Sequence, residues 1–113
     1  MWVYLTDALL SIVAHRDRPG ELLVRARFDG DIEAVFPGAA VIETPEADYR
    51  FRATVPRDVV AQAIAARASA IDYPNFKGTL PHRTMADRSR ADAYHTAHAA
   101  ALEAQADTAD LID

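Results

Sequence analysis

Cysteine is absent from the 113 residues, so the chain can form neither a disulfide framework nor a thiolate metal site. The absence is compatible with a reducing cytoplasm, which is where we expect the protein. No apolar run approaches the about 20 residues that a membrane-spanning helix needs. The first residues, Met1 to Asp7, also lack the basic start and the apolar stretch of a secretion signal. We therefore expect a soluble protein that has no membrane partner.

Glycine and lysine are scarce. The four glycines are isolated, which excludes the glycine-rich loop that cradles phosphates in nucleotide-binding proteins. Lys77 is the one lysine, and all other basic residues are arginines. The formal net charge is -5, whereas a domain that binds duplex nucleic acid is normally basic. We expect no duplex nucleic-acid partner, although arginine remains suited to bidentate contacts with a carboxylate or a phosphate.

The acidic residues are concentrated at the C-terminal end. Residues 103–113 carry four acidic side chains and no basic one, while the other 102 residues carry 12 basic and 13 acidic side chains. Most of the net charge therefore comes from this end. We expect an acidic tail, from about residue 106 to residue 113, that can be disordered. Between Arg50 and Arg90 the chain is locally basic instead.

A single domain is expected over residues 1–113, because a content of 50% hydrophobic residues can fill one modest core. Apolar residues at every second position indicate strands, and apolar residues at helical spacing indicate helices. The expected strands are residues 2–5, 8–15, 22–28, 41–44 and 49–55, and the expected helices are residues 31–36, 57–71 and 84 or 85 to about 105.

The order of these elements predicts an α+β fold. The central strand-helix-strand-strand unit can form a right-handed crossover in which the last strand is inserted antiparallel between its two predecessors. We therefore expect a variant of the ferredoxin-like fold. Its five-stranded, mostly antiparallel sheet has the order 1-2-3-5-4, and its helices pack mainly on one face.

Four arginines alternate with apolar residues in the third and fifth expected strands: Arg25, Arg27, Arg50 and Arg52. Because these strands are neighbours in the expected sheet, the four side chains should lie together on the face opposite the helices. Like charges placed across a ladder cost stability, so we expect anions close by, and Glu43 is one candidate. Phe28, Tyr49 and Phe51 alternate with the arginines and should face the core.

Two explanations of the arginine cluster remain open. The arginines can be paired with acidic residues of the same chain or of a dimer mate, or they can bind an anionic partner. The second expected strand bears on the choice, because residues 9–14 are apolar on both faces except at Ser11. A strand with this pattern is usually covered on both sides. We therefore expect the C-terminal helix or a second subunit to cover part of the arginine face.

The segment 71–78 combines aromatic, acidic, amide and basic side chains. It can be a plain connector between two helices, with Pro74 shaping the turn. It can also be a binding loop in which Tyr73, Asn75 and Lys77 converge on a ligand, since binding residues concentrate in loops held by a rigid scaffold.

Several segments together resemble a known family. They are Trp2-Val-Tyr4, Ser11-Ile-Val13, Val24-Arg-Ala-Arg27, Asp31-Ile-Glu33, Asp48-Tyr-Arg-Phe-Arg-Ala53, Ile71-Asp-Tyr-Pro-Asn-Phe-Lys77 and Tyr94-His95. In this pattern, which spans most of the chain, the sequence resembles a family of small bacterial proteins of unknown function. The resemblance implies one domain and brings no reaction, cofactor or ligand with it. The chain departs from the family in the last helix, where large aromatic residues are expected and His98, Ala101 and Leu102 occur.

Patterns for catalysis and metal binding are weak. Ser11 lies within an expected strand, without the sharp turn that presents a nucleophilic serine. His95 and His98 have a spacing that can share a metal ion, with His82 upstream, but the spacing indicates no further ligand. We therefore predict no catalytic residue, no metal site and no cofactor.

The sequence favours a small non-enzymatic interaction or regulatory module. Its arginine face, with the loop of Tyr73, Asn75 and Lys77 at the edge, would bind an acidic protein surface or a second copy of the chain as a homodimer. The alternative is an enzyme or binding protein that acts on a phosphorylated or carboxylate small molecule through the same arginines. An enzyme would need a concave pocket that holds the arginines next to a titratable group.

Overall fold

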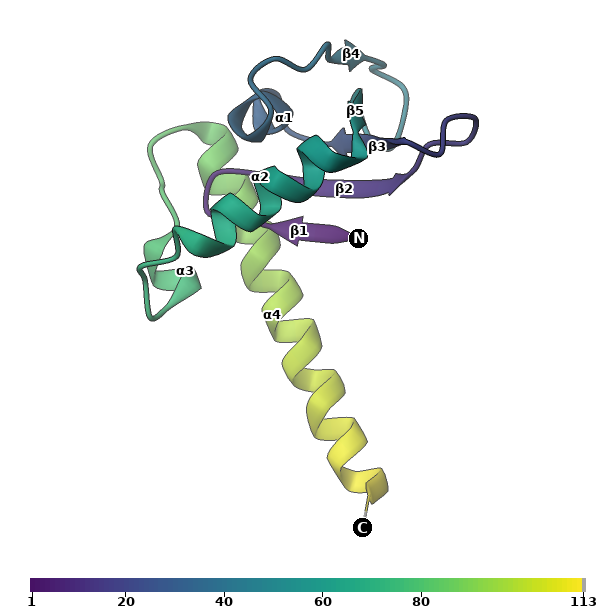
Figure 1. Cartoon of the computed structure of the whole chain (residues 1–113). Coiled ribbons are helices and arrows are strands. Elements are labelled where there is room, and N and C mark those ends of the chain that lie inside the picture. The colour runs from purple at the N-terminus through teal and green to yellow at the C-terminus, as the bar shows by residue number, and fades with distance from the viewer. Residues whose placement is uncertain (113) are drawn as a thin grey trace.

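The computed structural model describes the backbone of residues 1–112 and the side chains of residues 1–109. Five strands form one antiparallel sheet (Figure 1). In chain order they are β1 (Trp2–Tyr4), β2 (Leu9–Ala14), β3 (Glu21–Ala26), β4 (Ile42–Glu43) and β5 (Phe51–Pro56). The order in the sheet is β1-β2-β3-β5-β4, which confirms the predicted α+β fold and strand order.

The helices in the described part of the chain are α1 (Asp31–Val35), α2 (Arg57–Ser69), α3 (Phe76–Thr79) and α4 (Met85–Ile112). The single turn α3 lies in the segment expected to be a loop. It forms because the side chain of Asn75 accepts a hydrogen bond from the backbone amide of Gly78 at 3.0 Å. The sequence pattern missed this short cap.

Helix α4 is longer than the sequence predicts. It starts at a reciprocal cap. The backbone amide of Thr84 donates to the carboxylate of Asp87 at 3.2 Å, and the backbone amide of Asp87 donates to the hydroxyl of Thr84 at 3.0 Å. It continues through Ile112 instead of ending near residue 105, because its alanine-rich sequence contains no glycine or proline that would stop it. Most of the expected acidic tail is therefore helical backbone, and Asp113 lies outside the described residues.

One face of the sheet carries the main hydrophobic core. Cross-strand neighbours such as Ile12, Val24 and Ala53 are buried side by side on this face, since alternate residues of a strand point the same way. Helix α1 adds Ile32 to the cluster and α2 adds Val60. Helices α1 and α2 therefore pack on the same face of the sheet, as the sequence predicts.

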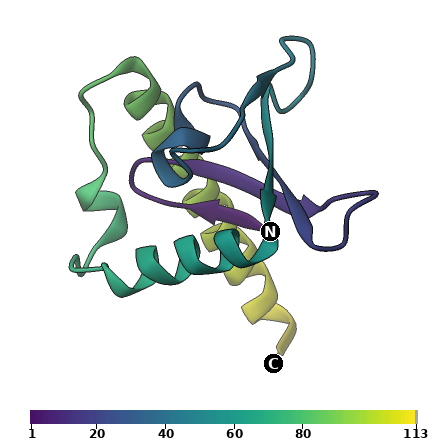
Figure 2. The ribbon, with the colours of Figure 1, turned by 45° about the horizontal axis from the view of Figure 1, so that its top comes forward.

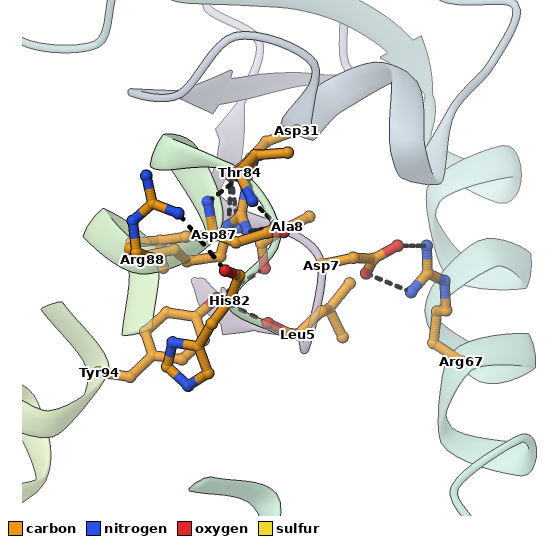
Figure 3. A network of polar contacts seen from close by, with 12 residues as sticks. Leu5, Asp7, Ala8, Asp31, Arg67, His82, Thr84, Asp87, Arg88 and Tyr94 are labelled. Atoms are coloured by element: carbon orange, nitrogen blue, oxygen red, sulfur yellow. Dashed lines mark hydrogen bonds and ion pairs between the residues drawn. The ribbon is translucent and has the colours of Figure 1, made fainter. Parts of the chain in front are cut away.

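Helix α2 is also held by Arg67. The Arg67 guanidinium donates to both carboxylate oxygens of Asp7, in the β1–β2 turn, at 2.7 and 3.1 Å (Figure 3). It donates a third hydrogen bond to the carbonyl of Ala34 at 3.0 Å. Hydrogen bonding to Asp7 raises the pKa of Arg67. Because both side chains are partly exposed, the pair orients the helix and contributes at most about 1 kcal/mol.

Helix α4 packs where β1 and β2 join. The ring of Tyr94 stacks on the ring of Tyr4, with centroids 4.9 Å apart. The Tyr94 hydroxyl donates a bifurcated hydrogen bond to the carbonyl oxygens of Leu5 and Ala8, at 2.7 and 2.8 Å. These contacts cover one end of the sheet face opposite the main hydrophobic core. The C-terminal helix therefore covers only the β1–β2 end of the face on which the arginines were expected. Trp2, on the same face, remains 69% exposed.

The C-terminal half of α4 projects away from the rest of the domain (Figure 1 and Figure 2). Every side chain from Ala99 to Ala109 is exposed. The radius of gyration is 15.8 Å, whereas a compact domain of this size has about 13 Å. The projecting half of α4 lengthens the molecule, whose extents are 47 × 35 × 34 Å.

Candidate functional site

Arg25 and Arg52 lie directly opposite each other on β3 and β5. Two like charges in this position repel, and the repulsion is relieved because the side chains leave the ladder in different directions. Arg25 donates to Oγ of Ser11 on β2 at 2.7 Å. Arg52 turns towards the segment before β5, where its Nε donates to the carbonyl of Tyr49 at 3.2 Å and its Nη2 lies 3.5 Å from Asp48.

Tyr49 is buried beneath two of the arginines. The guanidinium carbons of Arg25 and Arg27 lie 4.3 and 4.1 Å from the centroid of its ring. Cation–π contacts of this kind contribute about 0.5–2 kcal/mol each. The prediction that Tyr49 faces the main core was therefore wrong. Regular strand structure in β5 begins only at Phe51, so the alternation that correctly buries Phe51 does not extend back to Tyr49.

Only some of the four arginines are paired with a carboxylate. Among the side chains that the structure describes, Arg25 and Arg27 form no ion pair with a carboxylate. The Nε of Arg25 is buried and has no hydrogen-bond partner. Arg50 lies 3.6 Å from Glu43 in an exposed pair, which is worth at most about 1 kcal/mol. We call Arg25, Arg27, Arg50 and Arg52, together with Tyr49, the cationic face.

Two cavities open beside Arg27. The larger, of about 320 Å³, is also bounded by Arg50, Asp29 and Glu43. The smaller, of about 70 Å³, is bounded by Ser11 and Tyr49 among others. Only the larger one reaches the lower end of the range for ligand pockets, which is about 300–1,000 Å³. The cationic face is therefore accessible from solvent and is not sealed by the acidic side chains of residues 1–109.

The arginines change the acidity of Tyr49. Burial alone would raise the pKa of Tyr49, because it removes water from the phenolate. Hydrogen bonding with Ser11 and Trp2, together with the positive charges of Arg27 and Arg25, outweighs burial and lowers the pKa from its ordinary value. The cationic face thus stabilises negative charge at its centre.

A titration of the tyrosine rings by ¹³C NMR should show this effect. We expect the Tyr49 ring to ionise at lower pH than the buried Tyr94, whose pKa is raised mainly by burial. Arg27→Gln should move the Tyr49 pKa upwards, because it removes a positive charge next to the ring, whereas Arg16→Gln in the exposed β2–β3 loop should leave it unchanged. Equal effects of the two substitutions would contradict the proposed electrostatic contact.

An aromatic groove lies next to the cationic face. Its volume is about 620 Å³, and its walls come from β1, α3 and α4. Tyr94 links the three elements, since its ring lies 4.9 Å from Tyr4 and 5.5 Å from Phe76 between centroids. Trp2 and Tyr4 line both the groove and the 70 Å³ cavity beside Arg27. The two surfaces therefore adjoin.

The structure separates the three predicted loop residues. Asn75 and Lys77 line the aromatic groove. Tyr73 packs near Phe76, with 6.0 Å between ring centroids, but lines a different cavity beside Arg67. The side-chain oxygen of Asn75 is already engaged in capping α3. Of the predicted loop residues, Lys77 is thus the one whose side chain adds positive charge to the groove.

No family model, no curated protein and no solved structure matches this chain. The resemblance to a family of small bacterial proteins therefore stays a prediction. Along residues 1–112, no helix is long and apolar enough to cross a membrane. Among the side chains of residues 1–109, no three histidine or acidic side chains are grouped to hold a metal ion.

The closest polar contact in the described residues joins Asp31 of α1 to Arg90 of α4. Their side chains are 1% and 5% exposed. Nη2 and Nε of Arg90 donate to the two carboxylate oxygens of Asp31, at 2.5 and 3.2 Å. Asp31 also accepts a hydrogen bond from the backbone amide of Leu9 at 2.9 Å, and Arg90 donates to Asp87 at 3.0 Å. The pair fixes α4 against α1 and β2 and so positions Tyr94.

Sequence reasoning missed this ion pair because it assigned another role to Asp31. Asp31 was expected only as the first residue of the helix over residues 31–36. The N-cap of that helix is Gly30, whose φ of 90° is a left-handed conformation that glycine adopts without strain. Asp31 is the first helical residue, and its side chain is buried. Burial raises its pKa, and the bonds from Arg90 and Leu9 oppose that effect.

Proposed function

We propose that this protein is a non-enzymatic interaction module whose cationic face binds an acidic surface, either of another protein or of a second copy of the chain. The observation that carries the proposal is that Arg25 and Arg27 are held in place by the ring of Tyr49 without a carboxylate partner among the described side chains. Guanidinium groups that are already positioned lose less conformational freedom when they bind a carboxylate.

The distribution of charge favours a protein surface over a small anion. Asp29 and Glu43 line the same 320 Å³ cavity as Arg27 and Arg50. A phosphate or a small dicarboxylate in this cavity would meet negative charge on its walls, whereas carboxylates spread over a protein surface can each contact one arginine. The loose pair of Arg50 and Glu43 costs little to exchange for such a contact.

Binding is also better supported than catalysis. A reaction at this site needs a titratable group within reach of the arginines. The titratable groups there are Tyr49, whose side chain is buried beneath Arg25 and Arg27, and the carboxylates of Glu43 and Asp48, which are paired with Arg50 and Arg52. The lowered pKa of Tyr49 follows from hydrogen bonding and from the nearby positive charges of Arg27 and Arg25, so no separate catalytic role has to be invoked.

The proposal is tested by calorimetric titration with a 12-residue glutamate peptide as the probe. Arg27→Gln with Arg50→Gln should weaken binding by about tenfold or more, since each removed guanidinium loses a charge-assisted contact. The matched control is Arg16→Gln with Arg18→Gln, which removes the same charge from the β2–β3 loop and should leave the affinity within about twofold. Binding should also weaken as ionic strength rises.

Titrations with inorganic phosphate and with glutarate distinguish a protein-binding face from the alternative, which is a site for a small anionic molecule. Binding of either small anion with an affinity equal to that of the glutamate peptide, lost in Arg27→Gln with Arg50→Gln, would favour a small-molecule site and overturn the proposal. Equal weakening of peptide binding in both double variants would also overturn it, because the cationic face would then be no different from any other exposed arginine.

A further inference from the structure

The smaller cavity beside Arg27, of about 70 Å³, differs from its larger neighbour in the charge of its walls. Residues of β1 and β2 line it together with Arg27 and Tyr49. Asp29 and Glu43 line the 320 Å³ cavity, whereas no acidic side chain of residues 1–109 lines the smaller one. An anion in the smaller cavity would therefore meet positive charge without a competing carboxylate.

Ser11 is a buried hydrogen-bonding group in the wall of this cavity. The residue is 2% exposed, and its Oγ accepts a hydrogen bond from Nη2 of Arg25 at 2.7 Å. Because a guanidinium has no acceptor, this contact does not use the proton of the Ser11 hydroxyl. The charged donor also polarises the hydroxyl, which strengthens the bond that Ser11 itself donates. Ser11 thus relays the positive charge of Arg25 to a cavity that Arg25 does not line.

Tyr49 and Arg27 add to the donors around the cavity. Tyr49 is 7% exposed and brings a second hydroxyl. The guanidinium of Arg27 lies 4.1 Å from the centroid of that ring and forms no ion pair with a carboxylate among residues 1–109. The Nε of Arg25 is buried without a hydrogen-bond partner. Charged donors in such surroundings are stabilised when an anion joins them.

The volume of the cavity fits a carboxylate group. A water molecule occupies about 30 Å³ in the liquid, so a cavity of about 70 Å³ has roughly the space of two waters, which is comparable with a carboxylate. A phosphate group has four oxygens and is larger than this space. A whole small-molecule ligand needs about 300 Å³ or more. The cavity therefore suits the tip of one side chain.

The cavity is apolar at its mouth and polar at its floor. Trp2 is 69% exposed and stands at the mouth, whereas the buried Ser11 lies at the floor. Tyr4 and Leu9 supply further apolar wall. Such a wall suits the methylene groups of a side chain whose charged end lies deeper. Glutamate has two methylene groups before its carboxylate and so reaches further than aspartate, which has one.

We propose that this cavity is a carboxylate pocket, which receives one glutamate side chain of the acidic partner. The glutamate carboxylate accepts hydrogen bonds from the hydroxyls of Ser11 and Tyr49 and pairs with the guanidinium of Arg27. The other arginines of the cationic face then contact acids around this anchor. The pocket rests on the function proposed above, because its occupant belongs to the acidic partner.

Calorimetric titration with the 12-residue glutamate peptide and with an aspartate peptide of equal length tests the pocket. The wild-type chain should bind the glutamate peptide about fourfold or more tightly, since one further methylene group is buried. Ser11→Ala should weaken binding of the glutamate peptide by about tenfold and remove the preference over aspartate. The matched control Ser69→Ala removes an exposed hydroxyl from the end of α2 and should leave both affinities within about twofold.

Tyr49→Phe is a second, independent variant, which carries the test if Ser11→Ala fails to fold. It removes a hydroxyl but keeps the ring on which Arg25 and Arg27 lie. It should also weaken binding of the glutamate peptide by about tenfold. Trp2 is the single tryptophan, so its fluorescence should change when the glutamate peptide fills the pocket. Circular dichroism verifies that each variant is folded.

Two results would overturn the pocket while leaving the proposed function intact. One is equal affinity of the wild-type chain for the glutamate and aspartate peptides. The other is unchanged affinity for the glutamate peptide in both Ser11→Ala and Tyr49→Phe, while Arg27→Gln with Arg50→Gln still weakens binding. If the wild-type chain bound neither peptide, the proposed function itself would be wrong, and the pocket with it.

Discussion

Arg90→Met should lower the free energy of unfolding by about 3–5 kcal/mol, one of the two largest effects that we expect of a single substitution. The substitution leaves the carboxylate of Asp31 buried without its cation, and that side chain is only 1% exposed. Replacing the arginine by an apolar side chain of similar length preserves most of the packing, so the loss reports the ion pair. Urea denaturation followed by circular dichroism measures it.

Arg88→Met is the matched control for this experiment. Arg88 lies on the same helix but is exposed, and its guanidinium makes a single long hydrogen bond to the carbonyl of His82, at 3.4 Å. The control should change the stability by no more than about 0.5 kcal/mol. If Arg90→Met were no more destabilising than Arg88→Met, the buried pair would not be what fixes α4 to the sheet.

Tyr94→Ala should cost about 3–5 kcal/mol, because it deletes a large buried ring and leaves a cavity. Tyr94 is 2% exposed and stacks with both Tyr4 and Phe76. Its loss should therefore also release α3 and the start of α4 from β1. The ring-current shifts of Tyr4 and Phe76 in the NMR spectrum would disappear together with the stability.

Tyr94→Phe separates the ring from the hydroxyl. It keeps both stacking contacts but removes the hydrogen bonds to the carbonyls of Leu5 and Ala8, and the expected cost is about 1–3 kcal/mol. The ring-current shifts of Tyr4 and Phe76 should persist. A loss for Tyr94→Ala no greater than that for Tyr94→Phe would show that the aromatic stack does not hold the helices.

The parts of the fold that sequence reasoning predicts depend on regular patterns. The strand order follows from the order of the elements and from the handedness of the crossover. The neighbourhood of β3 and β5 follows from that order and brings arginines of the two strands together, as Arg25 and Arg52 show. Ile12 and Val24 are buried where alternation puts them. These inferences need only local periodicity and one topological rule.

The parts that it misses depend on single contacts between distant residues. Asp31 and Arg90 are 59 positions apart, and nothing in the local sequence of either indicates the other. Tyr49 lies just outside the regular strand, so alternation assigned it to the wrong face. The aromatic groove requires β1, α3 and α4 to meet at Tyr94, and α3 itself depends on one side-chain cap at Asn75.

The central claim is that the cationic face is a binding surface for carboxylates, and its most direct test is site-resolved NMR during titration with the glutamate peptide. We expect the guanidinium signals of Arg25 and Arg27 and the ring signals of Tyr49 to shift first and most. These signals should return to their starting positions when salt is added. Shifts that are as large at Arg16 and Arg57, or shifts that leave Tyr49 unmoved, would contradict it.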